Sequence, residues 1–107
     1  MYARQVSMEL NPNSMTDFTH KLESEILPLL RKQKGFKDEI TFIEPNGKRA
    51  FAVSLWENKQ DAEIYSQKSY ADVTKMLSKL VQGTPQVKVF EVAHSTFHKT
   101  GVKEKAA

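Results

Sequence analysis

The sequence has 107 residues, with 39% hydrophobic and 27% charged side chains, which is the balance of a single globular domain. It contains no cysteine, so disulfides, thiolate metal sites and a cysteine nucleophile are excluded. The 16 basic and 13 acidic residues leave a net charge of only +3. Because the basic residues are scattered rather than clustered on one face, we expect no nucleic-acid partner.

The sequence offers no segment that would cross or enter a membrane. The longest apolar runs span only a few residues, as at 26–30 and 50–53. The N-terminus has no basic stretch followed by an apolar one, which a secretory signal would need. We therefore expect no membrane partner and a cytoplasmic location.

The spacing of apolar residues predicts a strand and then a helix in the first third of the chain. Residues 2–10 alternate apolar and polar side chains, which is typical of a strand with one buried face. Ser14 followed by Asp17 is the pattern of a helix start, and an apolar stripe at helical spacing follows it. Gly35 suits the left-handed position after a helix, so we expect this helix to end at Lys34.

Pro28 interrupts this helical stripe. A proline has no N–H to donate to the carbonyl four residues earlier, here that of Ser24, and its ring crowds that carbonyl. We therefore expect a kink or a break near residues 25–27, with the helix departing from ideal geometry at Ser24.

A β-hairpin is predicted in the middle of the chain. Residues 36–44 and 49–57 are rich in apolar side chains, and the turn signal Pro45-Asn46-Gly47 lies between them. Residues 50–53 are apolar throughout, which is typical of a central strand that is covered on both faces.

A second helix and a last strand complete the chain. Asn58 and Ser69 each stand three residues before an aspartate, so two helix starts lie close together. This spacing predicts a helix that is bent or re-started near Ser69 and ended by Gly83. Residues 86–97 are predicted to form the last strand.

The element order β-α-β-β-α-β predicts an α+β, ferredoxin-like fold. In that fold two helices cover one face of a four-stranded antiparallel sheet. The strands carry more apolar side chains than one helix layer can cover, including Val6, Phe42, Phe51, Val53 and Val89. A symmetric homodimer, with sheet packed against sheet, would provide the second cover.

Two segments resemble the antibiotic biosynthesis monooxygenase family. In that family a Gly-Phe pair ends the first helix, as in KQKGFKDEITF at residues 32–42. The third strand ends in Trp-Glu before a helix with aromatic residues, as in AVSLWENKQDAEIYSQKSYADVTKML at residues 52–77. The resemblance covers residues 2–97 and implies a dimeric α/β barrel, with a family domain over 1–97 and a polar C-terminal tail over 98–107.

The activity implied by this resemblance is that of a cofactor-independent monooxygenase. Its substrate would be a quinol-like or other electron-rich aromatic small molecule. The alternative is a non-catalytic small-molecule-binding or regulatory dimer of the same fold. The polyketide-oxidising branch pairs a Trp at the end of strand three with an earlier Asn; this chain has Trp56, but Ala52 and Ser54 precede it.

No cofactor or metal is expected. The haem-degrading branch of the family uses an Asn on strand one, a Trp in helix two and a His ten residues later. Those positions fall near Gln5 or Ser7, on Tyr65 and on Lys75, and none matches. Without that imidazole there is no ligand for haem iron, so haem degradation is not expected. The sequence also has no glycine-rich phosphate motif and no cluster of metal ligands.

Four residues are candidates for a substrate site. Trp56 would form an apolar wall that stacks on a flat substrate, or else it is a core residue with a satisfied N–H. Tyr65 and Tyr70 flank the helix re-start, and their hydroxyls would bind a phenol or simply pack at the helix–sheet boundary. His20 is the candidate catalytic base because imidazole titrates near neutral pH, although it would equally face solvent beside Glu23.

Overall fold

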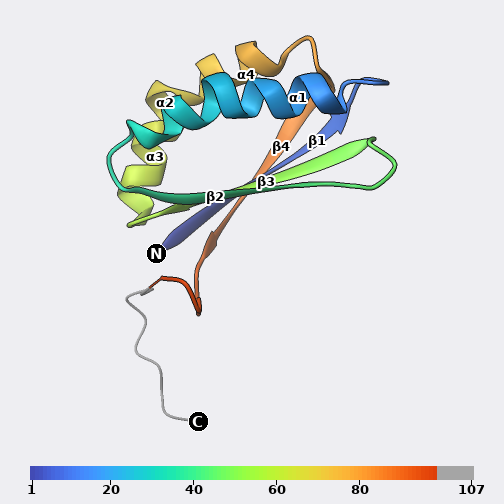
Figure 1. Cartoon of the computed structure of the whole chain (residues 1–107). Coiled ribbons are helices and arrows are strands. Elements are labelled where there is room, and N and C mark those ends of the chain that lie inside the picture. The colour runs from blue at the N-terminus through green and yellow to red at the C-terminus, as the bar shows by residue number, and fades with distance from the viewer. Residues whose placement is uncertain (99–107) are drawn as a thin grey trace.

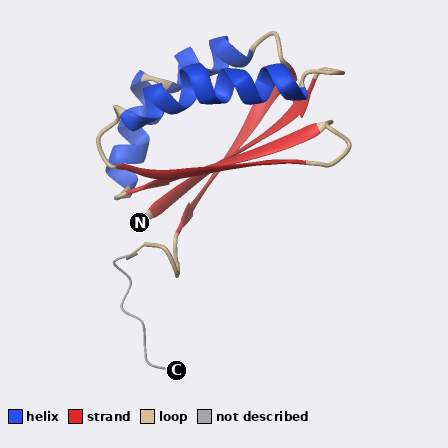
Figure 2. Ribbon diagram, in the orientation of Figure 1, coloured by secondary structure: helices blue, strands red, loops and turns tan. Residues whose placement is uncertain are grey.

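One antiparallel sheet carries all the helices on a single face (Figures 1 and 2). The strands are β1 (Tyr2–Leu10), β2 (Phe36–Ile43), β3 (Arg49–Trp56) and β4 (Val81–Glu91), in the spatial order β2-β3-β1-β4. The helices are α1 (Met15–Lys21), the π turn η1 (Leu22–Ile26), α2 (Leu27–Arg31), α3 (Lys59–Lys68) and α4 (Tyr70–Leu77). This arrangement confirms the predicted ferredoxin-like fold.

The structure is a computed structural model, and it describes residues 1–98. Of the polar tail predicted for 98–107, residues 99–107 lie outside the described part. His98 lies within it, and its Nε2 atom is 3.2 Å from Oδ2 of Asp38 on β2. No helix within residues 1–98 is both long enough and apolar enough to cross a bilayer.

The first helix breaks where Pro28 predicts it. The N–H of Leu27 donates to the carbonyl of Leu22, five residues earlier, so residues 22–26 form a π turn that contains Ser24. Because Pro28 has no N–H to donate to Ser24, the normal α-helical ladder is interrupted at this point. The predicted departure from ideal geometry at Ser24 is confirmed.

The helix starts follow the predicted caps only in part. Asn58 caps α3, since its Oδ1 accepts from the N–H of Asp61 at 2.9 Å. Helices also begin directly after Ser14 and Ser69, as predicted, but neither serine side chain makes the capping hydrogen bond that this sequence pattern implies. Ser14 has helical dihedrals, φ −97° and ψ −3°, whereas a capping side chain needs an extended backbone. Its carbonyl accepts instead from the N–H of Phe18 at 2.7 Å.

The boundary between the last helix and the last strand differs from the prediction. Helix α4 ends at Leu77, so Gly83 does not end it. Strand β4 covers Val81–Glu91 rather than residues 86–97. Gly83 lies inside this strand with φ +65°, near the point where the register with β1 shifts. A glycine at such a bulge allows a backbone conformation that other residues resist.

The start of β2 lies very close to helix α3. Helix α2 ends at Arg31, earlier than the predicted Lys34, and Gly35 follows with φ +80°. The carbonyl of Gly35 accepts from the N–H of Glu57 at 2.7 Å. A Cβ atom at position 35 would stand 2.1 Å from Oδ2 of Asp61, so only glycine fits.

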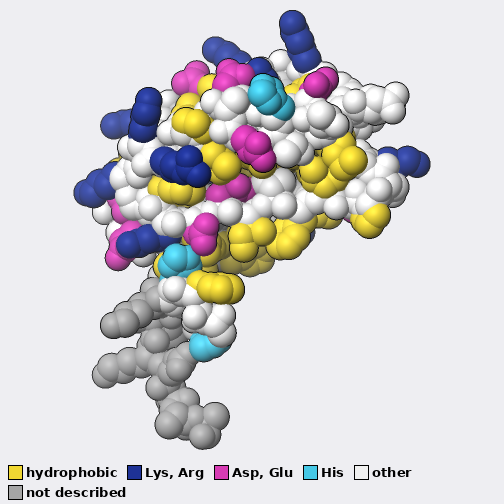
Figure 3. All heavy atoms as spheres, in the orientation of Figure 1, with side chains coloured by type: hydrophobic (Ala, Val, Ile, Leu, Met, Phe, Trp, Pro, Cys, Tyr) yellow, Lys and Arg dark blue, Asp and Glu magenta, His cyan; other side chains and the backbone are white. Residues whose placement is uncertain are grey.

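The core lies between the sheet and the helices, and the opposite face of the sheet is open. Trp56 and Phe18 are the largest fully buried side chains. Hydrophobic side chains gather along the lower edge of the molecule in Figure 3, on the side of the sheet away from the helices. Strand pairing places on this open sheet face the side chains of Ile40, Phe42, Phe51, Val53, Leu55 and Phe90.

Two glycines with similar backbone angles provide a test of the Gly35 contact. We expect Gly35→Ala to lower the free energy of unfolding by more than about 1 kcal/mol, because it adds a steric clash to the backbone strain. Gly47→Ala is the matched control, since Gly47 has φ +73° but no atom within 4 Å of the added Cβ. Urea denaturation measures both variants. Equal losses in the two would contradict the role of the contact with Asp61.

Candidate functional site

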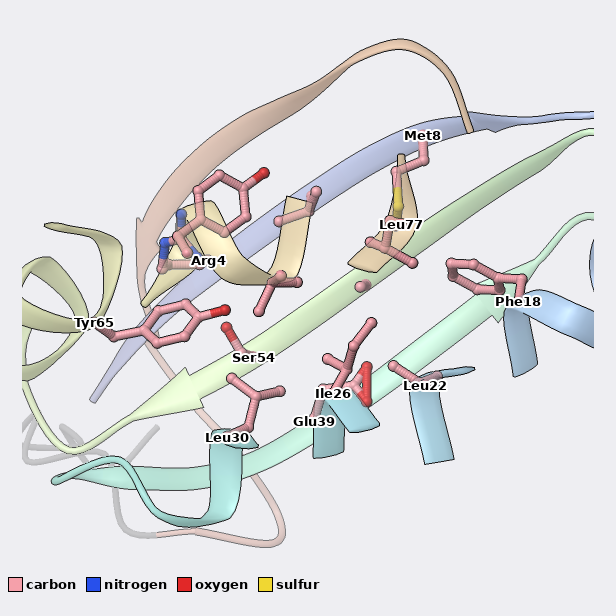
Figure 4. Close-up of a pocket in the computed structure, with 14 residues that line it drawn as sticks. Arg4, Met8, Phe18, Leu22, Ile26, Leu30, Glu39, Ser54, Tyr65 and Leu77 are labelled. Carbon is pink, nitrogen blue, oxygen red and sulfur yellow. The ribbon is translucent and has the colours of Figure 1, made fainter. Parts of the chain in front are cut away.

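A cavity of about 50 Å³ lies between the sheet and the helices (Figure 4). Most of its lining is apolar, with Met8 from β1, Phe18 from α1 and Leu22 from η1 as examples. The polar lining side chains are Arg4, Glu39, Ser54, Tyr65 and Tyr70. An apolar hollow with a few polar groups is the usual form of a small-molecule site.

Three aromatic side chains form a column at one end of the cavity. The rings of Trp56 and Tyr65 are stacked with centroids 4.8 Å apart, and the ring of Tyr70 meets that of Tyr65 edge-on at 6.3 Å. Trp56 is fully buried behind Tyr65 and does not line the cavity. Its indole N–H donates to Oγ of Ser54 at 2.9 Å. Trp56 therefore supports the wall, and Tyr65 and Tyr70 form its surface.

Arg4 lies against this column and is a site residue that the sequence analysis missed. Its side chain comes from β1, is 3% exposed, and places Cζ 5.1 Å from the Tyr65 centroid and 4.5 Å from the Tyr70 centroid. Burial lowers the pKa of Arg4 from its ordinary value, and the neighbouring tyrosines act in the opposite direction. The available signal was a charged residue at an inward position of β1, between Tyr2 and Val6.

The two tyrosines are held in their neutral form. Burial raises the pKa of Tyr65 to about 12 and raises that of Tyr70 above its ordinary value. The positive charge of Arg4 works against both increases but does not cancel them. At neutral pH both side chains are phenols, so they can donate hydrogen bonds to a ligand but cannot act as bases.

Glu39 is the second site residue that the sequence analysis missed. It is half-buried on β2, and burial raises the pKa of its carboxyl, while a hydrogen bond from the Thr41 hydroxyl acts in the opposite direction. None of the ion pairs among residues 1–98 includes Glu39. In Figure 4 it lies toward Leu22 and Ile26, away from the end with Arg4. A carboxyl with a raised pKa in an apolar cavity is suited to accept a proton from a ligand.

The side chain of Glu39 faces the cavity because of a β-bulge in β2. The register between β2 and β3 shifts between Phe36 and Asp38. With regular alternation, Asp38 and Ile40 would share the inward face with Phe36. The shift brings Glu39 inward and leaves Ile40 46% exposed.

His20 lies outside the cavity. It is exposed on α1, in a surface hollow with charged neighbours that include Lys21, Glu25 and Lys75. The helix turns Phe18 and Leu22 toward the sheet, so the position between them faces outward. Of the four predicted site residues, the structure thus brings Tyr65 and Tyr70 to the cavity, places Trp56 behind it, and leaves His20 on the surface.

Solved structures with the same fold include several oxygenases. A protein from Bordetella bronchiseptica assigned as an antibiotic biosynthesis monooxygenase matches with a TM-score of 0.72 and 16% identity, over 85% of this chain and 95% of that one. The monooxygenase of gene ActVA-Orf6 from Streptomyces coelicolor, in complex with nanaomycin D, matches with a TM-score of 0.72 and 16% identity, over 83% of this chain and 84% of that one. SnoaB, a cofactor-independent oxygenase from Streptomyces nogalater, matches with a TM-score of 0.72 and 11% identity, over 89% of this chain and 95% of that one.

These similarities show that the chain has the fold of the antibiotic biosynthesis monooxygenases. Other structures with this fold belong to proteins of unknown function. No protein-family model matches the sequence, and no curated protein is significantly similar to it. The predicted structural resemblance is confirmed at the level of the fold.

The raised pKa of Glu39 predicts a pH-dependent effect of Glu39→Gln on stability. A carboxyl whose pKa is raised by folding favours the folded state when it is protonated, and this contribution is lost as the pH rises through the folded-state pKa. We therefore expect Glu39→Gln to be more stable than the unmodified protein at pH 7, and this gain to vanish toward about pH 4. Urea denaturation across this range measures the difference. The control is Glu23→Gln, at an exposed position; a gain in Glu39→Gln that is the same at every pH would contradict the prediction.

Proposed function

We propose that the protein is a cofactor-independent monooxygenase that oxidises a quinol-like or other electron-rich aromatic molecule. The observation that carries this proposal is the apolar cavity in which the carboxyl of Glu39 has no ion-pair partner within residues 1–98 and neutral Tyr65 and Tyr70 offer hydroxyl groups. The fold shared with a cofactor-independent oxygenase supports it, as does the fold shared with a monooxygenase in complex with nanaomycin D.

The proposed reaction needs only a base and a suitable enclosure from the protein. Glu39 takes a proton from the bound substrate, and the resulting anion is electron-rich enough to reduce O₂ directly. For anthrone, the CH₂ group becomes a carbonyl: one atom of O₂ forms the new C=O bond, and the other leaves as water with the two hydrogens. The four electrons that reduce O₂ come from the substrate, so no further reductant is needed.

The remaining side chains would bind and orient the substrate. Tyr65 and Tyr70 donate hydrogen bonds to the oxygen on which the negative charge develops, a role that their neutral form allows. Trp56 holds the ring of Tyr65 in place by stacking. His20 has no part in this scheme because it lies on the surface, away from the cavity.

Binding of an aromatic substrate requires the cavity to widen. The present volume is about 50 Å³, whereas a cavity of about 150 Å³ is known to hold benzene. Two helix interruptions border the cavity: the π turn that carries Leu22 and Ile26, and the break at Ser69 that precedes Tyr70. We propose that the helices yield at these points when the substrate enters.

The activity is tested by oxidation of anthrone and menadiol under air. We expect faster product formation than in a protein-free blank, and incorporation of one ¹⁸O atom from ¹⁸O₂ into anthraquinone, measured by mass spectrometry. Glu39→Gln should lower the rate by about 10²-fold or more, as is typical when a general base is lost. Glu23→Gln is the control, and its rate should be unchanged. No acceleration by the unmodified protein would contradict the proposal, and tight binding without turnover would favour a non-catalytic binding dimer.

We propose further that the protein is a homodimer joined through the open sheet face. Phe42 is 54% exposed, Phe90 48% and Ile40 46%, and all three lie on the same face. Apolar side chains gathered on one surface of a small domain usually mark a protein interface. A second copy of the chain would cover this face by a two-fold contact of the same residues.

The homodimer is tested by placing a charge on the open sheet face. We expect Phe42→Lys to convert a dimer into a monomer at micromolar concentration, because the interface would bury the new ammonium group. Ile64→Lys is the matched control: Ile64 is 40% exposed, but it lies on helix α3. Sedimentation velocity measures both. A dimer that persists in Phe42→Lys, or an unmodified protein that is monomeric, would contradict the proposal.

A further inference from the structure

We infer that Arg4 binds the carboxylate of an acidic aromatic ligand, so that the cavity selects anionic over neutral aromatic molecules. The inference rests on the proposed function in taking this cavity as the substrate site, and it adds the chemical class of the substrate. The test of this inference measures binding alone. The inference can therefore fail while the proposed activity holds, and the proposed activity can fail while the inference holds.

The first argument is that Arg4 is a buried cation with no anionic partner in the described part of the chain. It is 3% exposed, and none of the ion pairs among residues 1–98 includes it. By contrast Arg49, on the surface, has Glu9 at 3.4 Å and Glu44 at 3.9 Å. A buried charge is costly unless it is paired, so an anionic ligand would supply what the protein leaves out.

The second argument is that Arg4 is held in place for such a contact. The rings of Tyr65 and Tyr70 lie 5.1 and 4.5 Å from its Cζ, and they attract the cation but carry no negative charge themselves. A guanidinium presents several N–H donors in one plane, which match the two oxygens of a carboxylate. Little side-chain freedom would be lost on binding, because the tyrosines already restrict the guanidinium.

The third argument is the polarity of the cavity. Arg4 and Tyr65 lie at one end, while Glu39 lies toward Leu22 and Ile26 (Figure 4). A ligand carboxylate would be repelled by Glu39 and attracted by Arg4, so only one orientation is favourable. With its acid group on Arg4, an aromatic ligand extends through the apolar part of the cavity and brings its far ring edge to Glu39, the proposed base.

The test compares two probes of similar shape, 2-naphthoate and 2-naphthalenemethanol, by titration calorimetry at pH 7. We expect the unmodified protein to bind the anion at least about tenfold more tightly than the neutral alcohol, as a charge-assisted hydrogen bond would provide. Arg4→Gln should remove this preference by weakening naphthoate binding and leaving the alcohol unchanged. Arg4→Lys should retain part of it, because the charge stays and the planar group is lost.

Arg31→Gln is the matched control, since Arg31 is exposed at the end of α2 and should not affect either probe. Equal affinities of the two probes in the unmodified protein would overturn the inference, and so would an equal loss of both in Arg4→Gln. If Arg4→Gln does not fold, the inference is tested by comparing the affinities of the two probes in the unmodified protein and in Arg4→Lys. Discrimination between the probes without oxidation of anthrone would refute the proposed activity and leave the role of Arg4 intact.

Discussion

The contact of Arg4 with Tyr65 and Tyr70 links the parts of the molecule that form the site. Arg4 comes from a central strand, whereas the tyrosines come from α3 and α4 on either side of the helix break at Ser69. Trp56 continues the column into the core by stacking on Tyr65. The same contact buries a positive charge beside two phenols, so packing and electrostatics at this end of the cavity cannot be varied separately.

The electrostatics of the cavity divide the chemistry between its two ends. Burial disfavours the charged forms of the tyrosines and of Glu39 alike, so it raises the pKa of all three side chains, that of Tyr65 to about 12. The carboxyl is the one group of the three that can serve as a base, because its ordinary pKa lies far below that of a phenol. The tyrosines remain donors. An apolar enclosure with donors at one end and a base at the other is sufficient for chemistry in which the substrate itself supplies the electrons.

Sequence periodicity predicted the fold well, because each element carries its own repeating pattern. The break at Pro28 was also predictable, since it depends on one missing N–H. The residues of the site were harder to predict from the sequence. Glu39 faces inward only because of a bulge in β2, and Arg4 is buried only because two aromatic rings from distant helices cover it. The alternation of β1 does place Arg4 on the inward face, but its burial, like the inward position of Glu39, depends on contacts between segments that are distant in the sequence. The end of α4 and the start of β4 were misplaced for a related reason, because Gly83 serves a bulge rather than a helix end.

The π turn in the first helix also determines the directions in which the side chains before and after it point around the helix axis, and these side chains form one wall of the cavity. In an unbroken α-helix the side chains of Phe18 and Leu30 would point about 120° apart around the axis. A π turn absorbs one residue, which reduces this angle to about 20°. Both side chains are buried and both line the cavity. A relative that lacks one residue in this segment would keep the same two side chains aligned on a continuous helix, so alignments between such proteins need a single-residue gap here.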